Sequence, residues 1–284
     1  MKVRELPDVA ALWQAAEGYL SLDPANNTQQ LSAAKRIMQL GARHGERFFV
    51  VYADDTQSEA VASAICVDSQ TLFLAAMPLV AASALAQELR ARDVPFTGVI
   101  GKRDVLQSFT DTFARPFTTH VNLMLYRLMQ VPDFGRATGA AHVATTADLD
   151  LLVEWHRAFE IEVGMIPLPT PLPERMNRRI NDGQLILWMD DGKAVSMAGA
   201  NPLPASSARI GPVYTPPVLR GCGYAQAVTA AASEHVQRDC PRTVFLFTDA
   251  INPASNKAYQ RIGYRHIADH AHWLFKAGDA QSTA

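Results

Sequence analysis

The sequence predicts an α+β protein with a mixed α/β sheet, and three observations carry that prediction. Helix-like and strand-like segments alternate in the second half, which has strands at its start, middle and end. A similar order of segments occurs in the first half. The chain has 284 residues, of which 48% are hydrophobic and 19% charged, so it can form two domains that each bury a core.

The boundary between the two domains is expected within residues 131–139. This segment contains several turn formers and no sustained apolar period. We therefore expect a first domain over residues 1–134 and a second domain over residues 140–278.

Caps and turns place the elements of the second domain. Thr145 or Thr146 can cap a helix with one apolar face, and Asp190-Asp191-Gly192 can turn a hairpin. Asn252-Pro253 opens the last helix, and Gly263 can end it. In order, we expect a strand at 142–144, helices over about 147–162 and 174–181, strands over 184–189, 194–200 and about 208–214, a helix over 224–237, a strand over 244–248, a helix after 252, and two last strands within 264–275.

The first half repeats this order. We expect strands over 48–53, 59–67 and 71–77, a helix over 78–92, a strand over 96–100, a helix over 104–113 and a strand over 120–128. One feature does not repeat, because Met77 and Pro78 join strand to helix directly where the second half has a glycine-bearing loop. The pattern favours an internal duplication in which one copy keeps a working site.

Composition limits the kinds of partner. The net charge of −2 and the pI near 6.4 give no overall attraction to nucleic acid or to an acidic membrane, so an anionic ligand needs a local binding device. Cys66, Cys222 and Cys240 form no Cys-x-x-Cys pair, which favours a reducing, cytoplasmic setting over a disulfide framework. The longest apolar stretch, residues 72–82, contains Pro78 and is too short to span a membrane.

The local device is expected in the loop after residue 214. It reads Arg220-Gly221-Cys222-Gly223-Tyr224-Ala225 and lies between an expected strand and an expected helix. The glycines allow a tight turn with inward amides, the helix N-terminus adds positive dipole character, and Arg220 adds a charge. The spacing matches neither a P-loop nor a dinucleotide-binding fingerprint. The alternative is that the two glycines only turn the chain.

A second motif follows about thirty residues later as Asn252-Pro253-Ala254-Ser255-Asn256-Lys257-Ala258-Tyr259. Together the two segments resemble the Gcn5-related N-acetyltransferase (GNAT) superfamily. The loop looks like its acyl-CoA pyrophosphate loop, Arg/Gln-x-x-Gly-x-Gly/Ala, and the second segment looks like its helix with an Asn before it and a Tyr one to two turns in. The first half resembles a degenerate GNAT copy without the cofactor loop, as in tandem GNAT proteins.

The resemblance implies a set of cofactor contacts for acetyl-CoA. The pantetheine arm would lie along the backbone of Val213, Tyr214 and Thr215, beside a bulge or pairing break at Gly211-Pro212, and Tyr259 would protonate the departing thiolate. Without a ligand, Asn252-Pro253 is a good helix start and Tyr259 an ordinary half-buried aromatic. We expect the Tyr224 and Tyr264 rings to serve packing. The expected cofactor-binding residues are Val213, Tyr214, Thr215, Arg220, Gly221, Cys222, Gly223, Tyr224, Ala225, Asn252, Ser255 and Asn256.

The acceptor side is less defined by the sequence. An amine of pKa about 10.4 must lose a proton before it attacks, so the site needs a base, a water relay or a desolvating pocket. His156 and Glu160 share a helix face and are candidate catalytic residues with Tyr259, and Asp249 ends the neighbouring strand. The alternatives are that His156 is a core histidine, that Glu160 is a solvated helix charge and that Asp249 is a turn former. Trp155, Phe159 and the proline-rich loop 165–173 are expected to form the acceptor wall.

A metal site is conceivable at His266, His270 and His272, but we expect surface histidines at a strand end and no metal.

The sequence therefore predicts a two-domain, acetyl-CoA-dependent N-acetyltransferase acting on a small-molecule or peptide amine, as a monomer or homodimer that binds neither nucleic acid nor membrane. The other hypothesis is a non-catalytic acyl-CoA-binding or regulatory module.

Overall fold

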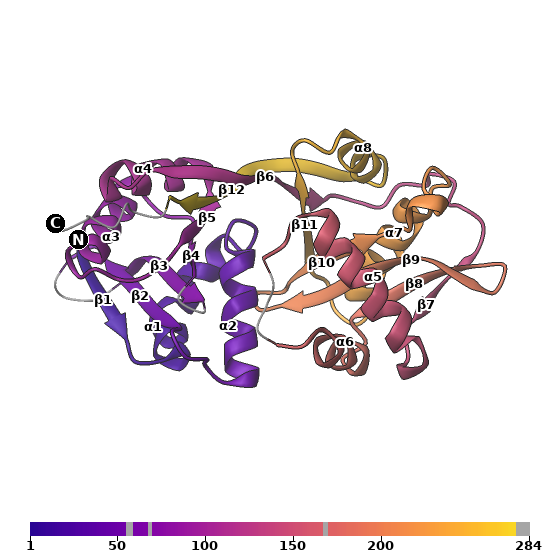
Figure 1. The fold of residues 1–284 in the computed structure, drawn as a ribbon, viewed down its shortest axis with the longest axis horizontal. Helices are drawn as coiled ribbons and strands as arrows, with labels where there is room; N and C mark the ends of the chain where they lie inside the picture. The colour runs from indigo at the N-terminus through magenta and orange to yellow at the C-terminus, as the bar shows by residue number, and fades with distance from the viewer. Residues whose placement is uncertain (55–58, 68–69, 167–169, 277–284) are drawn as a thin grey trace, which may run out of the picture. The chain divides into compact units, whose positions relative to one another are not determined.

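The structure is a computed structural model that describes residues 1–54, 59–67, 70–166 and 170–276. Two compact units make up the chain, and neither is one continuous stretch (Figure 1). Unit 1 contains Met1–Leu125, Asp249–Ile251 and the described residues from Ile267 onward. Unit 2 contains Tyr126–Thr248 and Asn252–His266.

The first half of the chain forms a sheet with helices on it. Its strands β1 to β4 pair antiparallel in sequence order, and β4 pairs parallel with β5. Pro78 stands at the N-cap of α3, so no glycine loop separates β4 from that helix. The elements are β1 (Lys2–Leu6), α1 (Val9–Leu22), α2 (Thr28–Leu40), β2 (Arg47–Tyr52), β3 (Ala60–Val67), β4 (Thr71–Leu74), α3 (Leu79–Ala91), β5 (Gly98–Lys102), α4 (Arg103–Phe113) and β6 (Phe117–Leu128).

The second half repeats the order and the pairing. Strands β7 to β10 pair antiparallel in sequence order, and β10 pairs parallel with β11. The two halves therefore have one element order and one pairing scheme, as the duplication predicts. The elements are β7 (Ala140–Val143), α5 (Leu149–Glu162), α6 (Leu172–Asn181), β8 (Leu185–Asp190), β9 (Lys193–Leu203), β10 (Ser207–Tyr214), α7 (Tyr224–Gln237), β11 (Thr243–Asp249), α8 (Pro253–Arg261) and β12 (Tyr264–Phe275).

The prediction of two last strands within 264–275 is wrong, because the segment is the single strand β12. No glycine or proline interrupts it, so the chain has no turn former there. Its later residues pair antiparallel with β5, from His270 opposite Lys102 to Leu274 opposite Gly98. The end of β12 thus belongs to unit 1, and the compact units do not follow the expected ranges 1–134 and 140–278.

Aromatic packing explains why the end of β12 stays in unit 1. The ring of Phe275 lies 5.8 Å from that of Phe96 and 5.2 Å from that of Phe113. Trp273 stacks on Phe117 with 4.3 Å between ring centroids. Large aromatic side chains bury more apolar area than most residues, so this cluster fixes the strand in the core of unit 1.

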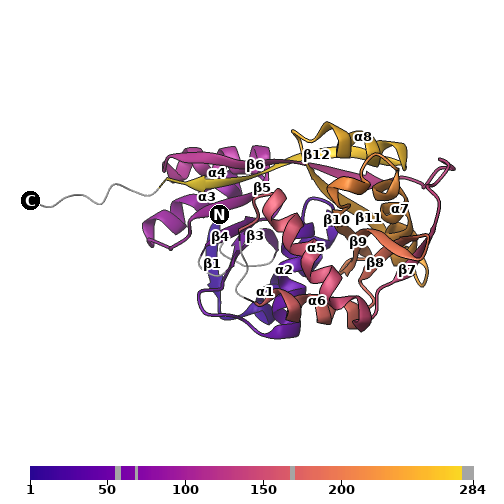
Figure 2. The same ribbon diagram turned by 45° about the vertical axis from the view of Figure 1, so that its right-hand side comes forward.

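In unit 2, α5 and α6 lie side by side over one face of the sheet (Figures 1 and 2). Their apolar residues form a core with Leu185, Leu187 and Met197, whose side chains alternate with those facing the other way. Helix α7 packs against β8, β9 and β10. Thr145 and Asp148 form a capping box just before α5, which agrees with the predicted cap.

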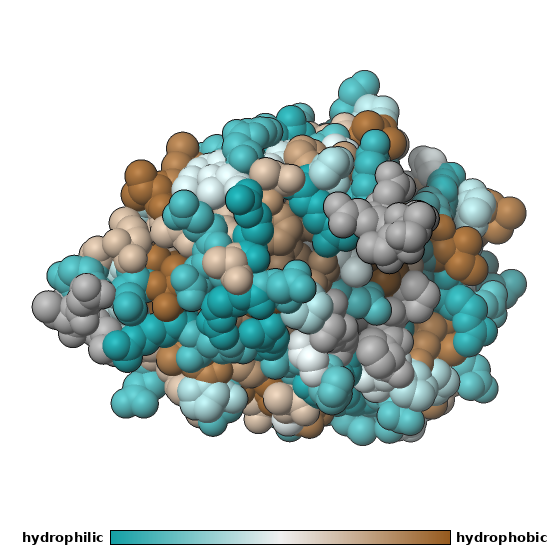
Figure 3. Space-filling view, turned by 60° about the vertical axis from the view of Figure 1, so that its left-hand side comes forward, coloured by the Kyte–Doolittle hydropathy of each residue, from teal (hydrophilic) through white to brown (hydrophobic). Residues whose placement is uncertain are grey.

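Hydrophilic residues separate small apolar groups on the face of the molecule that Figure 3 shows.

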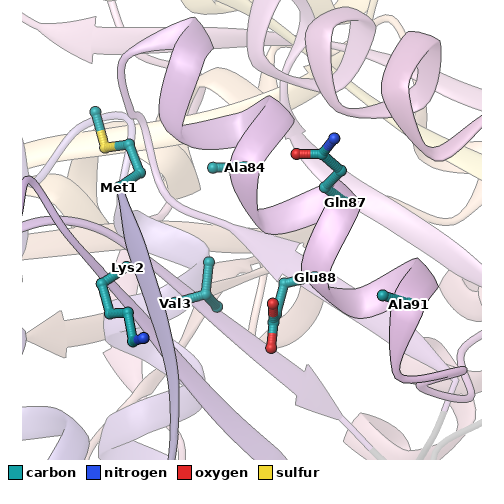
Figure 4. Close-up of a pocket in the computed structure, with 7 residues that line it drawn as sticks. All are labelled: Met1, Lys2, Val3, Ala84, Gln87, Glu88 and Ala91. Atoms are coloured by element: carbon teal, nitrogen blue, oxygen red, sulfur yellow. The ribbon is translucent and has the colours of Figure 1, made fainter.

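A pocket of about 410 Å³ lies between β1 and α3 of unit 1, with Lys2 and Glu88 as its charged lining residues (Figure 4). Its seven lining residues include neither His nor Cys. Among the described helices, none has both the length and the apolar character that spanning a bilayer requires.

Candidate functional site

The site in unit 2 begins where β10 separates from β11. The parallel pairing of the two strands runs from Ser207 to Arg209, although β10 continues to Tyr214. The register of β10 against β9 shifts between Ile210 and Val213, across the expected break at Gly211-Pro212. Proline has no amide hydrogen to donate to a ladder, so this step interrupts the pairing. The predicted pairing break is confirmed.

The glycine loop connects β10 to α7, as predicted. Gly221 and Gly223 have φ values of 85° and 82°, in the region that favours glycine. Helix α7 starts at Tyr224 without a side-chain cap. Within the described residues, the amides of Gly221 to Ala225 have no hydrogen-bond acceptor, and the loop is exposed or half-buried. Such amides at a helix N-terminus suit a pyrophosphate group, so the residues present fit acetyl-CoA.

Arg220 already has partners at this loop. Its Nε donates to the Thr215 carbonyl at 2.9 Å, and its NH2 group donates to the Glu162 carboxylate at 2.6 Å. The guanidinium carbon lies 5.9 Å from the centre of the Tyr214 ring. Because the Arg220–Glu162 pair is about half exposed, it stabilises the loop little and can yield to a phosphate. Sequence reasoning missed Glu162, which reads as an ordinary helix-end charge.

The backbone of the expected pantetheine strand is partly engaged. The Ser196 hydroxyl donates to the Tyr214 carbonyl at 3.0 Å and lies 2.8 Å from the Thr215 hydroxyl. Val213 and Tyr214 pair with β9 on one side. A ligand along this strand would therefore use the side that faces away from β9.

The two tyrosines that were expected to pack make hydrogen bonds through their hydroxyl groups, and one of them, Tyr264, is also buried. The Tyr224 hydroxyl donates to Asp190 at 2.5 Å, which raises the pKa of Tyr224 and ties the start of α7 to the end of β8. The Tyr264 ring is fully buried, and its hydroxyl lies 2.8 Å from that of Ser233. Neither hydroxyl is free for catalysis.

The motif at α8 has the geometry of a capped helix. The Asn252 side chain accepts a hydrogen bond from the Ser255 amide at 3.0 Å, and the Asn252 carbonyl accepts one from the Asn256 amide at 3.1 Å. The N-cap interpretation of Asn252 is therefore confirmed. The expected contacts of Asn252, Ser255 and Asn256 with a cofactor stay predictions, and the exposed position of Asn252 is compatible with them.

Tyr259 is half-buried on α8, and its ring lies 6.3 Å from that of Tyr264. Burial raises the pKa of Tyr259 to about 12. The phenol is therefore protonated throughout the neutral range. Within the described residues its hydroxyl has no hydrogen-bond partner, so no other side chain holds its proton.

The expected acceptor residues come together on α5. The Trp155 ring is buried 6.2 Å from the Tyr214 ring, and Phe159 packs in the same core. His156 Nε2 lies 3.4 Å from Glu160, as the shared helix face predicts. In the loop 165–173, residues 167–169 lie outside the described part of the chain.

The charges around His156 and Glu160 are unfavourable for a general base. Burial, together with the charge of Arg179, lowers the pKa of His156 to about 4. The imidazole is therefore neutral at pH 7 but only weakly basic. Glu160 accepts a hydrogen bond from Arg175 at 2.6 Å. Asp249 accepts one from the Ile251 amide at 3.0 Å, which is the geometry of a turn former.

A set of arginines beside the bulge was not foreseen. Arg179 donates to the Asn201 side chain at 2.9 Å and to the Gly211 carbonyl at 3.2 Å. The charge of Arg209 acts on Arg179. The only sequence signal is the basic run Arg178-Arg179, which in an amphipathic helix reads as a solvated face.

The expectation of surface histidines near the C-terminus is wrong for two of the three. His270 and His272 are buried in unit 1, with exposed fractions of 0% and 9%. His270 Nε2 lies 3.0 Å from the Asn26 side chain, and burial lowers the pKa of both histidines to about 4. No group of three or more His, Cys, Asp or Glu in the described part of the chain could hold a metal ion.

Comparison with known proteins places this geometry in a family. Residues 149–264 match the model of the acetyltransferase (GNAT) family. No curated protein matches the chain. A GCN5-related N-acetyltransferase from Sphaerobacter thermophilus superposes with a TM-score of 0.65 at 16% identity, over 95% of this chain and 94% of that one.

Two further solved structures have the same fold over nearly the whole chain. A GNAT acetyltransferase from Colwellia psychrerythraea superposes with a TM-score of 0.62 at 15% identity, covering 97% of this chain and 100% of that one. A tandem GNAT protein from the clavulanic acid biosynthesis pathway gives 0.56 at 13% identity, covering 96% and 98%. Residues 149–264 are therefore a GNAT-family acetyltransferase domain, in a chain that has the two-copy fold of a tandem GNAT protein.

Proposed function

We propose that the chain is an N-acetyltransferase that moves the acetyl group of acetyl-CoA directly to an amine, and that unit 2 performs the reaction. The observation that carries the proposal is the row of amides from Gly221 to Ala225, which lack acceptors in the described structure and open α7 next to the diverging end of β10. Unit 1 supports the assignment by contrast, because Pro78 starts α3 where such a loop would be.

The cofactor contacts follow from this placement. The loop amides and Arg220 would hold the pyrophosphate, and the backbone of Val213, Tyr214 and Thr215 would hold the pantetheine arm. The half-exposed Arg220–Glu162 pair lets Arg220 turn to a phosphate at small cost. When bound, acetyl-CoA supplies an acetyl group on a thioester, whose C–S bond is replaced by a C–N bond to the amine.

Two proton movements fall to the protein. Tyr259 is a neutral donor at every physiological pH, so it can stabilise the departing sulfur. On the acceptor side, an amine of pKa about 10.4 is mostly protonated at pH 7, and its deprotonation costs about 4.6 kcal/mol. With a pKa of about 4, His156 is a weak base, so proton transfer to it would lower the free energy of amine deprotonation only slightly. We therefore assign amine deprotonation to desolvation near the buried Trp155 or to water, with His156 and Glu160 shaping the wall.

The test is release of free thiol from acetyl-CoA in the presence of an amine panel that includes polyamines, aminoglycosides, amino acids and peptide N-termini. We expect at least one class to raise thiol release above the rate without amine, with an acetylated product of matching mass. Tight acetyl-CoA binding without turnover on any amine would instead identify a non-catalytic acyl-CoA-binding module.

The placement of the cofactor makes a separate prediction about thiol reactivity. Cys222 is exposed in the glycine loop, Cys240 is half-buried elsewhere and Cys66 is buried. Saturating acetyl-CoA should slow alkylation of Cys222 at least tenfold and leave Cys240 unchanged, as measured by peptide mass spectrometry. Equal slowing of both thiols, or of neither, would place the cofactor away from this loop.

A further inference from the structure

Two guanidinium groups meet where β10 leaves β11. Arg209 is the last β10 residue paired with β11, opposite Phe245. Arg179 of α6 reaches the same place, because it donates to the carbonyl of Gly211 in the bulge at 3.2 Å. Asn201 of β9 lies between them and donates to the carbonyls of Arg209 and Gly211, each at 2.8 Å. Arg209 is the register partner of Asn201, so the two side chains lie on one face of the sheet. Because Arg179 of α6 donates to the Asn201 side chain, this is the face that α6 covers.

The charges in this cluster do not balance. Glu160 is its one acidic group in the described structure, and Arg175 already pairs with it at 2.6 Å. Neither Arg179 nor Arg209 makes an ion pair with a described residue. The remaining ionisable neighbours are His156, which is neutral at pH 7, and Arg178, which adds another positive charge. The cluster thus holds at least two positive charges without a counter-ion.

Burial makes this imbalance costly. Arg179 Nε is buried and has no hydrogen-bond partner in the described structure. Burial and the positive charges of Arg209, Arg175 and Arg178 lower the pKa of Arg179 to about 10, and burial also lowers the pKa of Arg209. A buried charge is normally paired with an opposite charge, because an unpaired one costs free energy of folding. An anionic ligand would supply the charge that this cluster lacks.

A purely structural role explains only part of the cluster. The bonds of Arg179 to Asn201 and Gly211 can hold α6 against the bulge. These bonds do not include Arg179 Nε, which has no acceptor. They also do not explain the Arg209 side chain, which has no hydrogen-bond acceptor in the described structure. A carboxylate fits both needs, because its two oxygens accept from planar guanidinium donors.

We propose that Arg179 and Arg209 bind a carboxylate group of the acceptor, so that the acceptor is an amine that also carries a carboxylate. The inference rests on the proposed acetyl transfer and narrows its substrate class. The cluster lies at the pairing break, on the same face as the Trp155 ring beside Tyr214, so the carboxylate is held at the acceptor side of the diverging strands.

The turnover test compares each acid with its own carboxamide. The panel contains glycine, β-alanine, 4-aminobutyrate and the common α-amino acids, each paired with the corresponding amide. We expect kcat/KM to be at least tenfold higher for the preferred acid than for its amide, and Arg209→Gln to remove that preference while the KM for acetyl-CoA stays within twofold. Arg157→Gln, at an exposed position of α5, is the matched control and should keep the preference.

A second readout does not depend on turnover. Because Arg209→Gln removes a half-buried charge without a described partner, the melting temperature of the free protein should stay the same or rise. Addition of the same amino acids should raise the melting temperature of the wild type and of Arg157→Gln, but not of Arg209→Gln. A merely structural Arg209 would give the opposite pattern, with a lower melting temperature and no effect on ligand response.

The outcomes separate this inference from the proposed function. Thiol release with amides as good as with acids, or an unchanged acid preference in Arg209→Gln, overturns the carboxylate site and leaves acetyl transfer standing. No thiol release with any amine, together with an Arg209-dependent shift in melting temperature, supports the carboxylate site and overturns the transfer. The absence of both signals overturns the inference.

Discussion

Replacement of Gly223 by valine should abolish acetyl-CoA binding. Gly223 has φ of 82° at the N-cap of α7, and a β-branched residue in that region costs about 1–2 kcal/mol in backbone energy alone. The chain can relieve this strain only by rotating the peptide units around position 223. That rotation moves the amides of Gly221 to Ala225 away from a common point. We expect affinity to fall at least a hundredfold in calorimetry, or about 2.7 kcal/mol.

The control must carry the same strain elsewhere. Gly183 also has positive φ, 63°, and open space around its missing side chain, and it lies between α6 and β8. Gly183→Val should therefore lower stability by a similar amount and leave acetyl-CoA affinity within twofold. Arg220→Glu, which places a second acidic group beside Glu162, should also lower affinity at least tenfold. If Gly223→Val bound acetyl-CoA with wild-type affinity, this result would contradict the proposal that the loop binds the cofactor.

Local signals predicted the parts of the fold that depend on local chemistry. Helix α7 spans Tyr224–Gln237, as expected, because Gly223 marks its start and an Ala-rich run favours helix. The break at Gly211-Pro212 was also foreseen, since proline lacks the donor that a ladder needs. Both features follow from the covalent structure of a few neighbouring residues.

Features that depend on distant partners were not predictable. Nothing within β12 indicates that His270 to Leu274 pair with β5, which lies far away in the sequence, so the strand looked like part of the second domain alone. The burial of His270 and His272 follows from that pairing.

The arginine cluster was hidden for the same reason. From the sequence alone, Arg209 is indistinguishable from a strand residue that faces solvent, and Arg179 is indistinguishable from a solvated charge on a helix. Only the folded chain shows that a helix residue reaches the bulge in a strand.

Replacement of Tyr259 by phenylalanine should lower kcat about a hundredfold and leave acetyl-CoA affinity unchanged. The phenol has a pKa of about 12 and the departing thiol about 8.5, so complete proton transfer would be uphill by about 3.5 units. In the proposed reaction Tyr259 would therefore act as a hydrogen-bond donor with partial proton transfer, which places its expected effect at the low end of general acid catalysis. Because the phenol keeps its proton below about pH 11, the wild-type rate should show no alkaline loss from this group up to pH ~10.

Tyr264→Phe separates chemistry from packing at this site. Tyr264 has a fully buried ring and loses only its bond to Ser233, so the variant should be about 1 kcal/mol less stable with unchanged kcat. Both variants remove one hydroxyl from adjacent aromatic rings, 6.3 Å apart. A loss of kcat confined to Tyr259→Phe, measured as thiol release with the acceptor that the panel identifies, assigns the donor role to Tyr259. Equal turnover in wild type and Tyr259→Phe would show that the departing sulfur receives its proton from water.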